Sequence, residues 1–221
     1  MGKRIISQRR GRGTSTYRVP TYSFRPKIEY KKQNGKVVDI LANKLMASPL
    51  AKIEYDDKTQ GYIIAPEGIA VGEDITGKIL SLSEIPEGSK VFGIELRPNS
   101  GPKLCRAAGS FATLISKTKK ECILMLPSKK MLKVHPECMA SIGIPAGEGR
   151  KEKPWVKAGK RWIAMHRRGK LYPRTTAKAM NSVDHPFGGG GMGRSRSPAS
   201  RNAPPGRKVG HIAPKRTGKK R

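Results

Sequence analysis

The stretch LAKIEYDDKTQGYIIAP, Leu50 to Pro66, decides the fold of this chain. Its two ends, LAKIEYD (50–56) and GYIIAP (61–66), contain β-branched and aromatic residues, and the polar segment Asp57-Lys58-Thr59-Gln60 separates them. Two such runs joined by a short polar turn are typical of a β-hairpin. The hairpin predicts a body built from antiparallel strands.

The sequence on both sides of this hairpin extends the β pattern. KVVDIL (36–41) is a β-branched run after the turn signal Asn34-Gly35, and we expect about five short strands between residues 25 and 80. A turn-rich seam follows at 77–90, and beyond it we expect further strands at 90–96, 110–117, 122–127 and 130–135. Two groups of about five short strands with local connections predict two small barrels.

Positive charge is concentrated at the two ends of the chain. The formal net charge is +30. Residues 1–18 contain six Lys or Arg and no acid, residues 150–221 contain 21 against two acids, and residues 19–149 contain 19 against 14 acids. Such a charge opposes the compact state by self-repulsion. Two basic ends of this density favour nucleic acid as the compensating partner.

Membrane, secreted and metal-binding proteins fit the sequence less well. Nothing in the chain approaches the ~20 consecutive apolar residues of a membrane span, and arginines rather than an apolar segment follow Met1. We therefore expect an intracellular, soluble protein. Cys105, Cys122 and Cys138 are widely spaced and form no C-x-x-C pair, so we expect small buried thiols rather than a metal site.

One helix is predicted at PWVKAGKRWIAMHRRG, Pro154 to Gly169. Pro154 suits the first turn of a helix, and Gly169 suits its stop. One side would be apolar, formed by Trp155, Trp162, Ile163 and Met165. The pattern indicates an amphipathic helix that packs on the body and presents a basic surface to phosphates.

The segment NSVDHPFGGGGMGRSRS, Asn181 to Ser197, combines an Asp–His pair, four consecutive glycines and two arginines. Asp184-His185 has the residue types of a general-base dyad, but a glycine-rich tail supplies neither a nucleophile nor a pocket. Its G-x-G-x-x-G match lacks the preceding strand and following helix of a dinucleotide site. Glycine N–H groups can instead form a phosphate-binding nest, and His185 and Phe187 can stack on bases. The loop therefore predicts an RNA-contacting segment.

At this loop the sequence resembles the archaeal and eukaryotic form of the universal large-subunit ribosomal protein L2 family. The resemblance rests on AMNSVDHPFGGGGMGRSRS (179–197), MGKRIISQRRGRGTSTYRVP (1–20), YIIAPEGIAVGEDI (62–75), SEIPEGSKVFGIELRPNSG (83–101) and CRAAGSFATLI (105–115). The chain departs from the family pattern at Gly77 to Leu82, where related proteins have G-N-T-L-P-L after a longer insert.

The resemblance implies a mainly β fold with an OB-fold, then an SH3-like barrel, and basic, largely irregular N- and C-terminal extensions. The implied domains are a basic N-terminal arm (1–24), an OB-fold RNA-binding domain (25–82), an SH3-like barrel (83–150), a basic helix (151–170) and a Gly/Arg-rich rRNA-contacting extension (171–221).

The resemblance also implies a structural constituent of the large subunit in the cytoplasmic ribosome. It would bind large-subunit rRNA and support assembly, subunit association and the peptidyl transferase region. Its partners would be large-subunit rRNA, other ribosomal proteins and small-subunit rRNA at the subunit interface, with no membrane and no homo-oligomer. No intrinsic cofactor is implied, and Mg²⁺ would come only through bound rRNA.

The family's noted histidine falls on His185, which would support the architecture of an RNA-based active site without an enzymatic role of its own. The expected RNA-binding residues are Arg4, Arg9, Arg10, Arg12, Arg18, Lys157, Lys160, Arg161, Arg167, Arg168, Asn181, His185, Phe187, Gly188, Gly189, Gly190, Gly191, Arg194, Arg196, Arg201, Arg207, Lys208, Lys215 and Arg216.

Two other functions compete with this interpretation. Charge alone would also suit a general nucleic-acid compaction protein of chromatin type, although such a protein has no need for the glycine–histidine loop. An enzyme that uses Asp184-His185 would need an ordered pocket, which the local composition does not predict.

Overall fold

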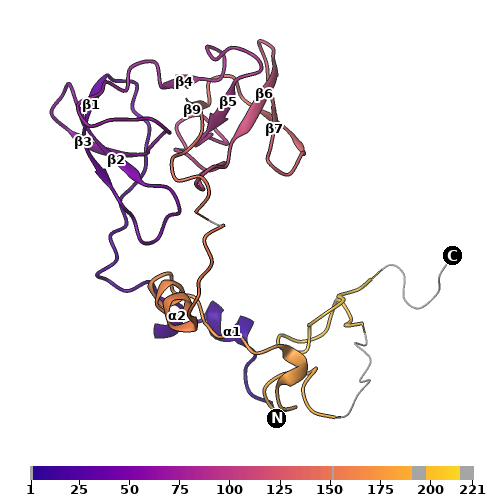
Figure 1. The fold of residues 1–221 in the computed structure, drawn as a ribbon. Coiled ribbons are helices and arrows are strands. Elements are labelled where there is room, and N and C mark those ends of the chain that lie inside the picture. The colour runs from indigo at the N-terminus through magenta and orange to yellow at the C-terminus, as the bar shows by residue number, and fades with distance from the viewer. Residues whose placement is uncertain (1, 151, 191–197, 215–221) are drawn as a thin grey trace. The chain divides into compact units, whose positions relative to one another are not determined.

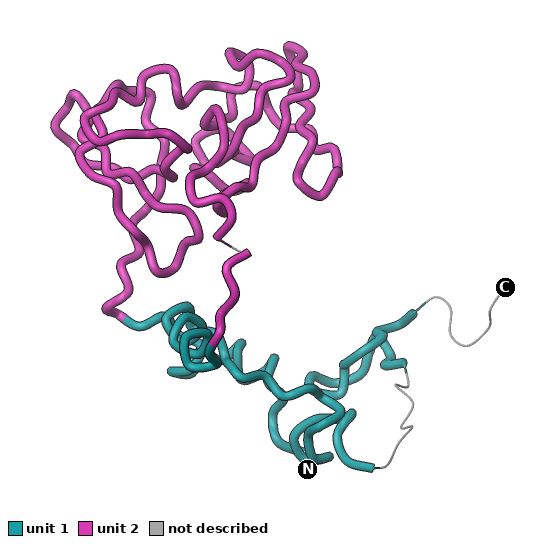
Figure 2. Tube along the Cα trace, viewed as in Figure 1, with its two compact units in different colours: residues 1–20, 157–221 teal, residues 21–156 magenta. Residues whose placement is uncertain are grey.

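The structure is a computed structural model of the 221-residue chain, and it describes residues 2–150, 152–190 and 198–214. The chain forms two compact units (Figure 2). Residues 21–156 form one of them, here called the β unit, and residues 1–20 with 157–221 form the other, here called the terminal unit. The prediction of a mainly β chain is confirmed.

The first sheet of the β unit is built around the predicted hairpin (Figure 1). Its strands are β1 (Gly35–Leu41), β2 (Leu50–Tyr55) and β3 (Gln60–Ile64), in the order β1-β2-β3 and antiparallel. In the turn, the Thr59 N–H donates to Asp57 Oδ1 at 3.0 Å, and Lys58 adopts a φ of 58°. Hydrogen bonds from Thr59 hold the pKa of the Asp57 carboxyl below its usual value. The turn chemistry of the sequence therefore sets the hairpin register.

The prediction of about five strands between residues 25 and 80 is wrong for the described residues. Residues 72–75 run beside β1, where the Val37 N–H donates to Glu73 O at 3.0 Å and the Ile75 N–H to Gly35 O at 3.0 Å. Gly72 and Gly77 have φ values of 87° and 77°, which interrupt a regular strand on both sides. Residues 72–75 therefore hydrogen-bond to β1 without forming a regular strand of the sheet.

The second sheet has six strands in the order β4-β9-β5-β6-β7-β8. Its strands are β4 (Ile79–Ser81), β5 (Lys90–Phe92), β6 (Ala112–Lys117), β7 (Cys122–Met125), β8 (Met131–Val134) and β9 (Met139–Ile142). The strands expected at 90–96, 110–117, 122–127 and 130–135 are confirmed in shortened form. β4 and β9 were not predicted, and β9 lies between the edge strand β4 and β5.

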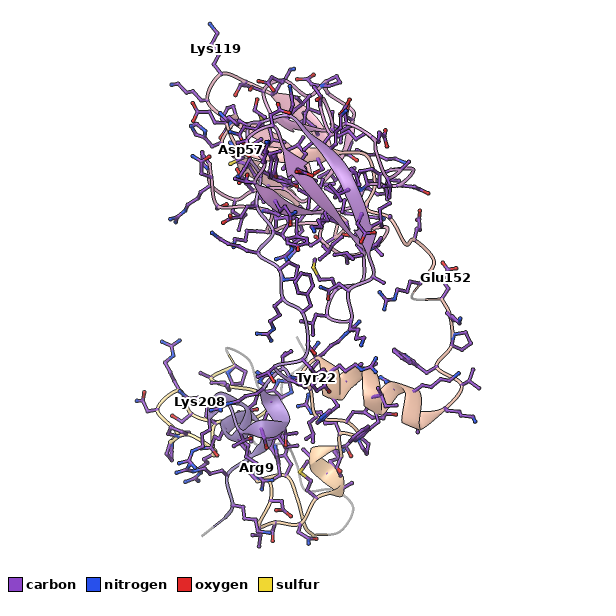
Figure 3. The ribbon with its side chains drawn as sticks, turned by 90° about the vertical axis from the view of Figure 1, so that its left-hand side faces the viewer. Arg9, Tyr22, Asp57, Lys119, Glu152 and Lys208 are labelled. Carbon is purple, nitrogen blue, oxygen red and sulfur yellow. The ribbon has the colours of Figure 1, made fainter. Side chains whose placement is uncertain are left out.

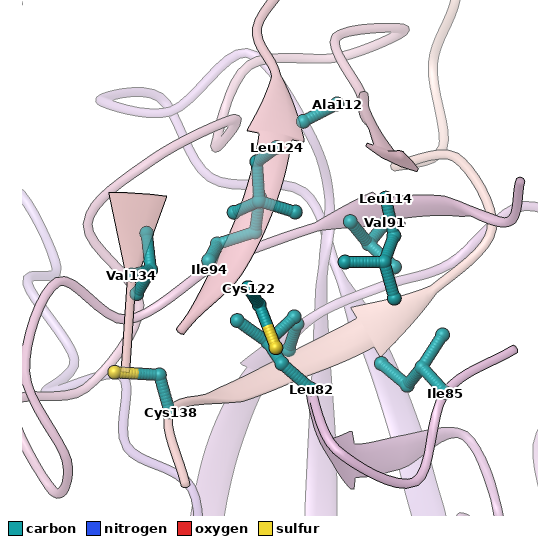
Figure 4. Packing of buried hydrophobic residues seen from close by; sticks show 11 residues of the cluster. Leu82, Ile85, Val91, Ile94, Ala112, Leu114, Cys122, Leu124, Val134 and Cys138 are labelled. Atoms are coloured by element: carbon teal, nitrogen blue, oxygen red, sulfur yellow. The ribbon is translucent and has the colours of Figure 1, made fainter. Parts of the chain in front are cut away.

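The second sheet folds around its own hydrophobic core (Figure 4). The core residues are Leu82, Ile85, Val91, Ile94, Ala112, Leu114, Cys122, Leu124, Val134, Cys138 and Ala140. Two of the three cysteines are buried here, and burial raises the pKa of the Cys138 thiol to about 11. A separate core of Val37, Ile53, Ile63 and their neighbours lies at the first sheet. Two sheets with separate cores agree with the predicted pair of small β modules.

Tyr30 makes one of the contacts between the two modules of the β unit, next to a buried apolar cluster of Leu50, Ile64 and Phe92 that draws on both sheets. Its hydroxyl donates to the Gly93 carbonyl oxygen at 2.8 Å and lies 2.9 Å from Ser141 Oγ. Burial raises the pKa of the Tyr30 phenol, so the group is a neutral donor. Gly93 has a φ of 59°, and a Cβ at this position would collide with the Tyr30 hydroxyl. The close approach therefore requires glycine at 93.

A buried carboxylate fixes the loop that follows Gly93. Glu95 is 1% exposed, and its oxygens accept the N–H groups of Gly101 at 2.7 Å, Met139 at 3.1 Å and Asn99 at 3.2 Å. Backbone donors satisfy a buried carboxylate as well as an ion pair does. Glu95 thereby attaches the loop at 96–101 to the start of β9.

The terminal unit contains the short helix α1 (Ile6–Gly11), the 3-10 turns η1 (Ser15–Tyr17) and η2 (Ala177–Ala179), and the helix α2 (Ala158–Arg167). The predicted helix exists, but it begins at Ala158 rather than at Pro154. Val156 has a φ of 58°, which no α-helix accommodates.

The predicted stop of α2 at Gly169 is confirmed. Gly169 has a φ of 61°, and the Lys170 N–H donates back to Met165 O at 2.9 Å, as in a Schellman cap. The predicted apolar side of the helix is not packed away, because α2 buries no residue.

Replacing Tyr30 with Phe tests the junction between the modules. We expect the free energy of unfolding to fall by about 1 kcal/mol, because the Gly93 carbonyl loses its donor. The control is Tyr22→Phe, at a side chain that is 68% exposed, and there we expect a change below about 0.5 kcal/mol. Urea unfolding of the full chain measures both values. Equal stability of the two variants would contradict a junction held by the Tyr30 hydroxyl.

Candidate nucleic-acid interface

The terminal unit holds most of the charge of the chain. Residues 1–20 and 157–221 contain 24 Lys or Arg and one acid, Asp184, which accounts for +23 of the formal net charge of +30. The exposed side chains of this unit include Arg9 and Lys208 (Figure 3). A unit of this size and charge attracts a polyanion strongly at physiological ionic strength.

The two ends of the chain come together in this unit, which the sequence analysis did not predict. The Lys3 N–H donates to Val183 O at 2.7 Å, and Lys3 Nζ lies 3.6 Å from Asp184 Oδ1. Ile5 is 8% exposed, and its N–H donates to Gln8 Oε1 at 3.0 Å. The basic arm and the glycine-rich tail therefore form one surface rather than two separate extensions.

The loop around His185 is closed by its own backbone. The His185 N–H donates to Asn181 O at 3.2 Å, the Gly188 N–H donates to His185 O at 2.8 Å, and the Gly189 N–H donates to Met180 O at 2.9 Å. A Cβ at Gly188 would collide with the carbonyl oxygens of Met180 and Asn181. Glycine at 188 is thus needed for the loop to close on itself.

The expected phosphate nest is wrong at two of its positions. The N–H groups of Gly188 and Gly189 are bonded inside the loop, so they do not point at a phosphate. Gly189 and Gly190 have φ values of 68° and 77°, which explains the need for glycine without an anion. Gly191 lies outside the described residues, as do the expected contacts Arg194, Arg196, Lys215 and Arg216.

His185 has one ring nitrogen engaged by its own loop. The Phe187 N–H donates to His185 Nδ1 at 3.0 Å, which leaves Nε2 as the protonated nitrogen of the neutral ring. The two rings lie 5.3 Å apart at 53°. His185 borders one hollow of about 350 Å³ that Ile5 and Arg174 also line, and another of about 380 Å³ that Arg4 also lines.

Asp184 and His185 do not act as a dyad in this geometry. Asp184 pairs with Lys3, and His185 Nδ1 accepts the Phe187 N–H, so the side chains have different partners. A general base in a dyad is oriented by the neighbouring carboxylate. The His185 imidazole is therefore oriented by its own loop and not by Asp184.

The predicted basic contacts lie mostly at the surface of the terminal unit. The exposed ones are Arg4, Arg9, Arg10, Arg12, Arg18, Lys157, Lys160, Arg161, Arg201, Arg207 and Lys208, while Arg167 and Arg168 are half-buried. The backbone orients some of them: Arg9 Nε donates to Arg4 O at 3.0 Å and Arg18 Nε to Gly13 O at 2.5 Å. The remaining guanidinium N–H groups suit phosphate oxygens.

The sequence analysis missed Arg174, which is exposed and lines the hollow beside His185. Its signal was available in the sequence. Between Glu152 and Asp184 the chain has nine Lys or Arg and no acid, and Arg174 is one of the nine.

Among the residues that the structure describes, no three His, Cys, Asp or Glu are grouped closely enough to hold a metal ion. Within those ranges, no helix combines the length and apolar character that crossing a membrane requires.

Known proteins of nearly the same length are similar in sequence to this chain. Residues 75–208 match the family model described as "Ribosomal Proteins L2, C-terminal domain". The chain is 44% identical to the "Large ribosomal subunit protein uL2" of Natronomonas pharaonis, over 99% of this chain and 97% of that protein. The proteins of the same name from Methanothermobacter thermautotrophicus and Methanocaldococcus jannaschii are 43% and 44% identical, over 100% and 99% of both chains.

Replacing Gly188 with Ala tests the closure of the loop. The added methyl group meets backbone carbonyls that have no room to move, so we expect the loop to open and the Gly189 N–H to lose its protection from hydrogen exchange. Gly11→Ala is the control, since a Cβ there meets no atom within 4 Å. The measurement is hydrogen exchange of the Gly189 N–H in both full-length variants. Undiminished protection of this group in Gly188→Ala would contradict the described closure.

Proposed function

This chain belongs to the L2 family of large-subunit ribosomal proteins, and we propose that it binds large-subunit rRNA through its terminal unit. Family membership confirms the resemblance that the sequence indicates and gives the protein a structural role in the ribosome. The protein would act in the cytoplasmic ribosome, where the terminal unit would contact the rRNA through its positive charge and its side chains.

The observation that carries the proposal is the charge of the terminal unit. A concentration of +23 in 85 residues, with its only acid paired to Lys3, suits a phosphate backbone far better than an uncharged partner. Arginine forks at this surface supply bidentate contacts to phosphate oxygens. Affinity would come mainly from counterion release, and the described contacts would fix the register of the protein on the RNA.

The loop at 181–190 adds a contact that charge alone does not provide. His185 presents its Nε2 edge while its Nδ1 is held, so its ring orientation is fixed before RNA binds. A fixed donor next to an aromatic ring suits hydrogen bonding and stacking with unpaired bases. We assign His185 to the support of rRNA architecture in the peptidyl transferase region, with no chemical step of its own.

Other partners follow from the same role. Other ribosomal proteins and, at the subunit interface, small-subunit rRNA would meet the protein in the assembled ribosome. Any Mg²⁺ at these contacts would be held by the bound rRNA.

Salt dependence tests the phosphate contacts. Arg9→Gln with Arg10→Gln removes two exposed charges from the terminal unit, and we expect the slope of log K against log salt to fall by about 1 to 2 for an rRNA fragment. Lys119→Gln with Lys120→Gln is the matched control, because it removes two exposed charges from the β unit and should leave the slope unchanged. Equal slopes for both double variants would argue against binding through the terminal unit.

Sedimentation tests the ribosomal role itself. In cell extracts run on sucrose gradients, we expect the tagged protein to travel with large subunits, at salt well above physiological. His185→Ala should still enter subunits, since its side chain is half-buried and makes one hydrogen bond to its own loop. Subunits that contain the variant should form peptide bonds more slowly. A wild-type protein that follows DNA would instead support nucleic-acid compaction and contradict the proposal.

A further inference from the structure

We propose that Trp162 on α2 is a stacking platform for an unpaired nucleobase of RNA, with His166 as the residue that positions it. The inference rests on the proposed binding of RNA by the terminal unit. It goes further in naming a base-binding site and the chemical class of its ligand, which is a single-stranded nucleotide rather than a duplex.

Trp162 and His166 form a flat pair on one side of the helix. Their ring centroids are 5.1 Å apart and their planes differ by 4°, with a spacing of four residues along α2. This is the offset parallel arrangement that aromatic rings prefer. The stack covers one face of the indole and limits its rotation, so the ring is already held in a fixed plane.

The indole remains open on a helix that buries none of its residues. Trp162 is 48% exposed, and its neighbour Ile163 is 45% exposed. A large aromatic side chain that has no core to enter leaves apolar surface in water, and such surface marks an interaction site when it lies among polar groups. The helix therefore presents Trp162 to a partner rather than using it to fold.

The helix surface next to the pair is open at Gly159. Gly159 lies three residues before Trp162 on α2, which puts both on the same side of the helix. A Cβ added at Gly159 would meet no atom of the described residues within 4 Å. A planar ligand on the indole can therefore extend over Gly159.

The charge around the pair favours a nucleotide over a peptide or a lipid. The segment between Glu152 and Asp184 contains nine Lys or Arg and no Asp or Glu. Arg161 immediately precedes Trp162 on α2 and Arg167 immediately follows His166, so the two arginines lie about 100° around the helix from the pair, one on each side. Arg161 is itself held over the Tyr172 ring at 5.0 Å, which orients its guanidinium group. An unpaired nucleotide offers a π face for Trp162 and a phosphate for the flanking arginines.

The chain contains its own control for this inference. It has two tryptophans, Trp155 and Trp162, and their exposures are nearly equal at 45% and 48%. Only Trp162 is stacked on a histidine in the described structure. Trp155→Phe leaves Trp162 as the sole indole fluorophore of the full chain, and Trp162→Phe leaves Trp155.

The experiment titrates these two variants with single-stranded oligoadenylate and with a duplex RNA of the same length. We expect oligoadenylate to quench the fluorescence of Trp155→Phe strongly and that of Trp162→Phe weakly, because adenine stacks on the one indole only. In a separate binding assay, Trp162→Ala should bind oligoadenylate about 5- to 150-fold more weakly than the wild type. Trp155→Ala should stay within about twofold of the wild type, and the duplex should not distinguish the two variants.

Further measurements on Trp162→Ala and on two His166 variants separate stacking from charge and from folding. Trp162→Ala should leave the salt slope unchanged, since it removes no positive charge. His166→Ala should reduce quenching, and His166→Phe should restore it by rebuilding the stack. Circular dichroism should show unchanged folding in Trp162→Ala, because α2 buries no residue.

The outcomes distinguish this inference from the proposed function. If the wild type binds both RNAs and Trp162→Ala behaves like Trp155→Ala, the platform is wrong and RNA binding by the terminal unit stands. If Trp162→Ala weakens the single strand and the duplex equally, the residue does not read unpaired bases and the inference is again overturned. If the wild type binds neither RNA, both the proposed function and the platform are wrong.

Discussion

Like-charge repulsion is the main constraint on the terminal unit and on how this part of the chain can be used. Its 24 Lys or Arg are opposed by Asp184 alone, and that carboxylate already lies 3.6 Å from Lys3 Nζ. The apolar burial that holds this unit is small, with Ile5 among its few buried side chains. A polyanion that neutralises the repulsion would therefore stabilise the unit as it binds, which couples its folded form to its RNA partner.

The β unit, in contrast, is stabilised by buried apolar residues and internal hydrogen bonds. Each sheet has its own apolar core, and a third buried cluster and the Tyr30 hydroxyl connect the two sheets. Buried Glu95 is satisfied by three backbone N–H groups. These contacts are internal and depend on no external charge. The β unit is thus stabilised by its own contacts, whereas the basic side chains of the terminal unit are available to bind a partner.

The sequence predicted what local patterns determine. The two β-branched and aromatic runs around the polar turn at Asp57 predicted the hairpin, and Gly169 predicted the stop of α2. Strands β4 and β9 were missed because each has three or four residues and is defined by pairing with the other across some 60 residues of chain. The union of arm and tail was missed because the contact between Lys3 and Val183 has no local signature. The phosphate nest failed because composition does not reveal that the N–H groups of Gly188 and Gly189 bond within their own loop.

Ultraviolet cross-linking of intact ribosomes, followed by identification of the peptides joined to nucleotides, would show which part of the protein contacts rRNA. We expect large-subunit rRNA to cross-link mainly to residues 2–20 and 157–214, with the aromatic and histidine side chains of the terminal unit among the modified positions. Cross-links confined to residues 21–156, or a protein that yields none with rRNA, would contradict rRNA binding through the terminal unit.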